Sequence, residues 1–173
     1  MSASHFRRYT TLPYLLDMLR ENRLPLLDPA SWDDKNDAHN LVTYKKKKGF
    51  KSVLALCIAD APEAYIHWKI YASNSSGVCI EFHKEKLINK FNHQNGFLHG
   101  YVEYVLLEKL RQYPPSVDDL PFIKRFAYQG ESEYRFIFTS TEKKTKIEYI
   151  SIDIDDIKQI VINPWVESPV YES

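Results

Sequence analysis

Short stretches of apolar residues, continuous or alternating with polar ones, recur along the chain and predict a series of strands. SVLALCIA (residues 52–59) is nearly continuous in apolar residues, which is typical of a strand buried on both faces. GVCIEFH (77–83) alternates instead, so Val78, Ile80 and Phe82 are expected on one face. Further strands are expected at FRRYT (6–10), YVEYVLL (101–107), ESEYRFIF (131–138), IEYISIDI (147–154) and KQIVINPW (158–165).

Helical spacing is clearest near the N-terminus, where leucines recur at positions 12, 15, 16 and 19. Thr10 or Thr11 can cap this helix, Pro13 suits its first turn, and we expect it to end near Asn22. A second helix is expected from Asp60, which has Glu63 at capping-box spacing. Two short helices are expected at 84–91 and 120–127.

Strands and helices in mixed order predict an α+β fold. We expect six to eight short strands, in mixed but mostly antiparallel sheets, with three or four helices. The length of 173 residues suits a single domain over residues 1–173. We find no internal repeat.

The overall charge is balanced, with 23 Lys and Arg against 23 Asp and Glu, so no global positive field draws the protein to nucleic acid or membrane. TYKKKKGFK (43–51) is a local charge run, which we expect to be a solvated face or loop after the polar stretch 28–40. A role in binding phosphate or nucleic acid is the alternative for these lysines.

Targeting and redox signals are few. Cys57 and Cys79 lie in apolar runs without a second Cys or His at metal-ligand spacing, so we expect buried free thiols. The chain shows no signal peptide and no apolar run long enough for a membrane span. We therefore expect a cytoplasmic protein with no membrane association, while the oligomeric state is left open.

Signatures of the common enzyme classes are absent: there is no Walker loop, Rossmann glycine motif, nucleophile elbow or HExxH. The strand 131–138 carries the most polar chemistry, because its alternation places Glu131, Glu133 and Arg135 on one face. These side chains form either an exposed salt-bridge ladder or a site in which a carboxylate stabilises an oxocarbenium-like centre. Arg8 is either a surface arginine or a cation that holds a pyrophosphate.

Other polar and aromatic residues also allow two interpretations. Trp68 and Tyr71 suit a helical core better than a ligand site, with His67 exposed beside them. The run 33–37 is rich in Asp and Asn, which is more typical of turn chemistry than of a metal site, so we expect no metal.

Taken in order, these segments resemble a bacterial family known as domain of unknown function 2971. The family pattern corresponds here to RRYTT (7–11), DPASWDDKNDA (28–38), WKIYASNSSGVCIEF (68–82) with VEY (102–104), ESEYRFIF and IKQIVINPW (157–165). Two segments depart from it: the loop 32–37 matches the family's asparagine-aspartate-proline turn only loosely, and the helix lacks the usual histidine after Trp68.

That family in turn resembles the ADP-ribosyltransferase fold, in which a first-strand Arg or His and a late glutamate act on NAD. The resemblance implies that Glu133 is the catalytic glutamate and Glu131 the upstream glutamate of the glutamate-x-glutamate motif. It implies that NAD, as substrate, is bound by Arg8, Tyr9, Trp68, Tyr71 and Arg135. The resemblance further implies that the acceptor is nucleic acid or protein, and that the enzyme acts as a toxin or phage-defence effector.

Two further hypotheses belong to other classes. The chain is either a non-catalytic module that binds a nucleotide, nucleic acid or protein, or a nuclease or other enzyme of metal-dependent phosphoryl transfer that uses the Asp-rich loop and the late glutamates. Tight binding without turnover would support the module, and calorimetry that shows no Mg²⁺ or Mn²⁺ binding would remove the metal-dependent enzyme.

Overall fold

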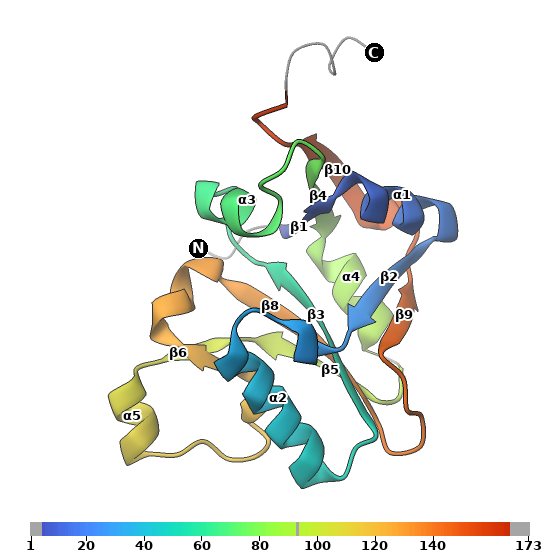
Figure 1. The fold of residues 1–173 in the computed structure, drawn as a ribbon. Coiled ribbons are helices and arrows are strands. Elements are labelled where there is room, and N and C mark those ends of the chain that lie inside the picture. The colour runs from blue at the N-terminus through green and yellow to red at the C-terminus, as the bar shows by residue number, and fades with distance from the viewer. Residues whose placement is uncertain (1–4, 93, 167–173) are drawn as a thin grey trace.

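The computed structural model describes residues 5–92 and 94–166 and contains an eight-stranded sheet and a two-stranded sheet (Figure 1). The strands are β1 (His5–Thr11), β2 (Arg23–Leu27), β3 (Ser52–Ala59), β4 (Gly77–His83), β5 (Phe97–Tyr101), β6 (Glu103–Val105), β7 (Ile123–Arg125), β8 (Glu133–Ser140), β9 (Ile147–Ser151) and β10 (Ile157–Ile162). The α-helices are α1 (Leu12–Glu21), α2 (Lys35–Lys48), α3 (Tyr65–Tyr71), α4 (Lys84–Phe91) and α5 (Leu107–Gln112). Short 3-10 helices are η1 (Pro29–Ser31), η2 (Leu120–Phe122), η3 (Phe126–Glu131) and η4 (Ile154–Asp156).

The large sheet is antiparallel and branches at β3. Its main path runs β10-β4-β1-β3-β2-β9, while β8 pairs with β3 and β5 pairs with β8. The small sheet pairs β6 with β7 in parallel. The predicted α+β class and mostly antiparallel pairing are confirmed, with more strands and helices than expected.

Strand β3 has one continuous edge and one divided edge. Along the first edge β8 pairs with β3 from Ser52 to Ala59. On the second edge, β1 pairs only at Ala59 and β2 only at Ala55. Residues 56–58 therefore face a gap in the sheet between β1 and β2.

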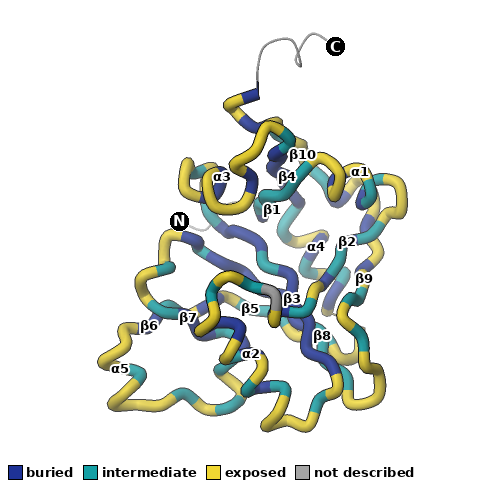
Figure 2. Tube along the Cα trace, in the orientation of Figure 1, coloured by how far each residue is buried: buried dark blue, intermediate teal, exposed yellow. Residues whose placement is uncertain are grey.

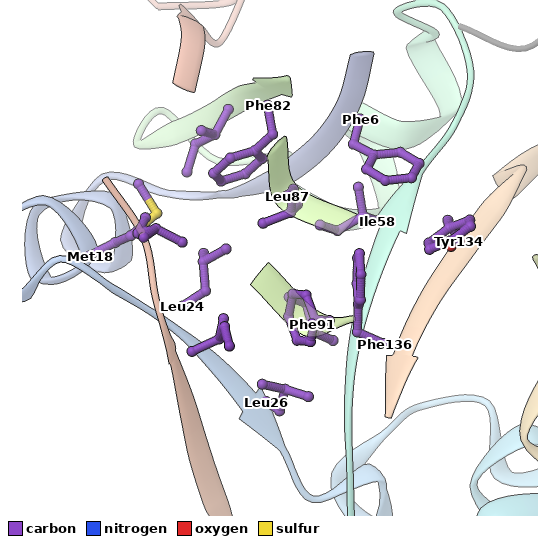
Figure 3. Close-up of a cluster of buried hydrophobic side chains, with 14 of the residues drawn as sticks. Phe6, Met18, Leu24, Leu26, Ile58, Phe82, Leu87, Phe91, Tyr134 and Phe136 are labelled. Carbon is purple, nitrogen blue, oxygen red and sulfur yellow. The ribbon is translucent and has the colours of Figure 1, made fainter. Parts of the chain in front are cut away.

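Both faces of β3 are covered, as its apolar sequence predicts. One face carries Leu54, Leu56 and Ile58 into the main core with α1, α4 and β8 (Figure 3). The other face packs Val53 and Ala55 against α2. Figure 2 shows β3 and β8 as the buried centre of the molecule. On the side of α2, β8 adds Ile137 to the same cluster.

Helix α1 confirms the sequence prediction, while the next two helices correct it. Asn22 ends α1 in the left-handed region with φ 50°. The lysine run is a solvated face, one of the two forms expected of it, but it forms the last turn of α2, a helix that was not predicted and that Gly49 ends at φ 73°. Helix α3 begins at Tyr65 rather than Asp60, because the Asp60 carboxylate binds Lys84 Nζ at 2.7 Å instead of capping a helix.

Two other segments also differ from the prediction. The helix expected at 120–127 is replaced by η2, β7 and the start of η3, and α5 was not predicted. In the first of these segments Pro121 lacks the backbone N–H that a helix interior requires, and residues 123–125 pair with β6 instead.

Candidate functional site

Two adjoining cavities lie beside the gap in the sheet. The first cavity has a volume of about 190 Å³ and is bounded by β1, β2 and residues 55–59 of β3. The second cavity has a volume of about 560 Å³ and is bounded by the start of α2, α3 and η3. The residues that line both are Trp32, Cys57, Tyr71, Glu131 and Glu133. The two predicted glutamates thus lie on the shared wall.

Two neighbouring arginines of β1 line the first cavity but differ in their partners. Arg7 is held by Glu81 at 2.7 Å and by the carbonyl oxygen of Ala61 at 2.5 Å. Over residues 5–92 and 94–166, Arg8 makes no ion pair or side-chain hydrogen bond. Burial lowers the pKa of Arg8 to about 10, so its guanidinium stays charged near neutral pH. Arg8 is therefore a cation that is free to bind an anion.

The aromatic residues predicted to line the site fall into two groups. Tyr9 lines the first cavity, and Tyr71 lines both cavities with 44% of its surface exposed. Trp68 is only 1% exposed, donates its indole N–H to Glu63 at 2.8 Å and packs against Ala72. Trp68 lines neither cavity, which confirms the core role that the helical pattern favoured for it and corrects the contact with NAD that the family resemblance implied.

His67 is buried, contrary to the expectation that it is exposed. Its ring stacks on Tyr9 with centroids 5.2 Å apart, and its Nε2 lies 3.1 Å from the carbonyl oxygen of Glu131. Burial lowers the pKa of His67, which favours the neutral ring. A neutral His67 with Nε2–H as donor ties α3 to the end of η3.

The alternation predicts that both glutamates lie on one strand, but the structure places them on two different elements. Glu131 ends η3, Ser132 takes the left-handed conformation with φ 45°, and β8 begins at Glu133. The turn nevertheless brings both carboxylates to Lys124, whose Nζ lies 2.5 Å from Glu131 Oε2 and 3.5 Å from Glu133 Oε2. Lys124 therefore bridges the pair.

Arg135 is fully buried behind Glu133, which corrects its predicted contact with NAD. Its Nε donates to Glu133 Oε1 at 2.6 Å, and its two terminal nitrogens donate to the two Asp37 oxygens at 3.0 and 2.8 Å. Its Nη1 also donates to the carbonyl oxygen of Pro121 at 2.8 Å. Arg135 is placed to orient Glu133 rather than to touch a ligand.

The partners that complete this charged cluster were not predicted from the sequence. Lys124 comes from β7 and Asp37 from α2, and the hydroxyl of Tyr104 accepts the backbone N–H of Glu133 at 2.8 Å. Their only signal was indirect: a buried Glu133 and Arg135 require charged partners. The Asp-rich loop is accounted for separately, because Asp34 caps α2 by accepting from the backbone N–H groups of residues 36 and 37.

The two glutamates have opposite pKa shifts. Burial works against ionisation of Glu133, but the charges of Arg135 and Lys124 outweigh it and lower its pKa to about 2. Burial raises the pKa of Glu131, and Lys124 only partly opposes this. Adjacent carboxyl groups whose pKa values are pushed apart are typical of sites that use one group ionised and the other for proton transfer.

The fold and the site together define an α+β protein with a carboxylate pair between two cavities and, in one of them, an arginine that pairs with none of the described residues. Residues 67–152 match a family described as protein of unknown function (DUF2971). This match supports the family resemblance found in the sequence, over a segment that includes Lys124, Glu131, Glu133 and Arg135. Neither a curated protein nor a solved structure matches the chain.

In the described part of the chain, no helix combines the length and the apolar character needed to cross a membrane.

Proposed function

We propose that the protein is an ADP-ribosyltransferase-like enzyme that uses NAD to modify a macromolecular acceptor. The observation that carries this proposal is the position of Glu133: its pKa of about 2 keeps it ionised, and it lies on the wall shared by two cavities. The donor would reach from the first cavity, which at about 190 Å³ is too small for a whole dinucleotide, into the adjoining second cavity. The unpaired Arg8 in the first cavity indicates that the donor is anionic.

The residues present suit NAD chemically. Arg8 would bind the pyrophosphate, while Tyr9 and Tyr71 offer ring surfaces to the flat groups of the dinucleotide. Cleavage of the glycosidic C–N bond passes through an oxocarbenium-like transition state, which a fixed carboxylate such as Glu133 stabilises. Glu131, with its raised pKa, would accept the proton that the acceptor loses.

The test compares wild type, Glu133→Gln and Glu85→Gln in nicotinamide release and in label transfer from NAD to cell protein, RNA or single-stranded DNA. Glu85 is an exposed glutamate in the first turn of α4, lines neither cavity and serves as the matched control. We expect Glu133→Gln to lose roughly 100-fold or more in rate and Glu85→Gln to match wild type. Equal turnover in wild type and a folded Glu133→Gln, checked by circular dichroism, would refute the assignment.

The burial of the carboxylates favours a second candidate, a binding module without catalysis. Glu133 is only 5% exposed, and both of its carboxylate oxygens face cations of the cluster. In that case Arg8 and the first cavity would bind an anionic nucleotide without consuming it. ADP-ribose binding by calorimetry, with no nicotinamide release from NAD, would select this candidate.

A further inference from the structure

Eight lysines gather at the end of the molecule opposite the start of α2. They come from the last turn of α2, the turn that follows it, and the loop between β8 and β9 (Figure 1). This lysine surface consists of Lys45, Lys46, Lys47, Lys48, Lys51, Lys143, Lys144 and Lys146. Figure 2 shows these segments as largely exposed.

Backbone and hydroxyl contacts hold the two segments side by side. The Lys51 N–H donates to the carbonyl oxygen of Ser140 at 2.7 Å. The Ser52 hydroxyl donates toward the carbonyl oxygens of Lys143, at 2.7 Å, and Thr145, at 3.2 Å. Ser52 and Lys143 are 91 residues apart in the sequence, so the fold builds the lysine surface from two distant segments.

Most of these ammonium groups have no acidic partner. Lys48 pairs with Asp118 and Lys143 with Glu148, each at 2.5 Å. The other six lysines form no ion pair within the described residues. Cations at a helix C-terminus stabilise the helix, which accounts for those in α2 but not for those of the β8–β9 loop.

The zero net charge of the chain conceals a separation of charge. Five carboxylates lie on or beside the lysine surface: Asp28, Asp118, its neighbour Asp119, Glu142 and Glu148. Outside this end, the chain has 15 Lys and Arg against 18 Asp and Glu. The positive end thus has a local field that the total charge does not reveal.

A hollow of about 320 Å³ adjoins the lysines. Lys45 and Lys46 line it together with the apolar Val42 and the half-buried ring of Phe50. Asp28 also lines it, and the Asp28 N–H donates to the carbonyl oxygen of Lys146 at 3.1 Å, which links the hollow to the second lysine segment. Cations around an apolar recess suit a phosphate chain whose unstacked base enters the recess.

We propose that the lysine surface binds single-stranded nucleic acid. Its lysines would contact phosphates, and its hollow would receive a base that a duplex keeps stacked. An anionic membrane fits less well, because Val42 is the one large apolar side chain of the hollow that is exposed, and a single valine gives a membrane little apolar surface to bind. That the bound strand is also the acceptor rests on the proposed function, but binding itself needs no NAD.

The test measures binding of labelled oligothymidine and oligouridine by fluorescence anisotropy, without NAD, for three proteins. These are wild type, a surface variant (Lys46→Gln, Lys144→Gln and Lys146→Gln) and a control variant with the same charge change elsewhere (Lys86→Gln, Lys109→Gln and Lys158→Gln). All six lysines are exposed, so both variants are expected to fold. We expect the surface variant to bind roughly tenfold more weakly, with a salt slope smaller by about 2, and the control variant to bind like wild type.

Several outcomes would overturn the proposal. An equal loss of oligonucleotide affinity in the surface variant and the control variant would show that binding depends on net charge alone. Tighter binding to a duplex than to a single strand would show that the hollow does not receive a base. Binding to phosphatidylserine vesicles but not to oligonucleotides would assign the surface to a membrane. Because no step requires NAD, loss of nicotinamide release would not affect this result.

Discussion

Arg7 and Arg8 are adjacent in the sequence, yet their surroundings give them different tasks. Arg7 is neutralised by Glu81 and holds β1 to β4, whereas Arg8 lines the first cavity and forms no ion pair with any described residue, the two glutamates of the cavity wall included. A half-buried cation without a partner lowers the stability of a fold unless a ligand compensates it. Arg8 is therefore better explained by binding than by stability.

Replacing Arg8 with methionine tests this interpretation, because methionine keeps much of the length of the side chain and removes its charge. We expect the free energy of unfolding of Arg8→Met to equal or exceed that of wild type. We also expect ADP-ribose to bind roughly 10–100-fold more weakly, the usual cost of a lost charge-assisted hydrogen bond. Urea unfolding and calorimetry measure the two effects; a marked loss of stability with unchanged binding would make Arg8 structural.

At the scale of elements, the junction between η3 and β8 decides where the carboxylates lie. Ser132 is a non-glycine residue in the left-handed region, with φ 45° and ψ 52°, and its carbonyl oxygen accepts the Asp60 N–H at 2.8 Å. This conformation ends η3 and starts β8 within a single residue. It allows Glu131 and Glu133 to reach the same Lys124 from two different elements.

Substitutions at Ser132 should separate backbone strain from side-chain chemistry. We expect Ser132→Gly to raise the free energy of unfolding by about 0.5–1 kcal/mol, and Ser132→Val to lower it by about 1–2 kcal/mol, because a β-branched residue disfavours positive φ. Chemical denaturation measures both. The same direction of change in the two variants would show that the hydroxyl, and not the backbone, determines the effect.

At the scale of the whole molecule, the charged cluster links stability to pH. The folded protein holds the pKa of Glu133 near 2, below its ordinary value of 4.5. Ionised Glu133 therefore stabilises the fold by about 3 kcal/mol above pH 4.5, and this contribution is lost as the pH falls toward 2. The raised pKa values of Glu131 and Asp37 act in the opposite direction, so the net dependence is smaller.

The contribution of Glu133 is isolated by comparing wild type with Glu133→Gln across this pH range. We expect wild type to have the higher free energy of unfolding near neutral pH. The difference in free energy of unfolding between the two proteins should shrink as the pH falls from about 4.5 to about 2, because the carboxyl then becomes neutral like the amide. Urea unfolding at a series of pH values measures the difference. A difference that stays constant with pH would mean that Glu133 has an ordinary pKa.

Local sequence patterns were sufficient for much of the sheet but not for the site. The apolar run of β3 and the alternation of β4 depend on their own residues, and both strands lie where predicted. Helix α2 was missed because few of its residues are apolar and its buried Asp37 looks like a loop residue. Asp37 and Arg135 are 98 residues apart, so no local pattern could pair them.

The charged cluster also constrains how this sequence can change over evolutionary time. Asp37, Lys124, Glu131, Glu133 and Arg135 come from four elements, and losing any one of them leaves its partners buried with uncompensated charge. Related sequences can lose this cluster only through paired or multiple substitutions, such as replacement of Asp37 together with Arg135. We therefore expect these two distant positions to covary in related sequences.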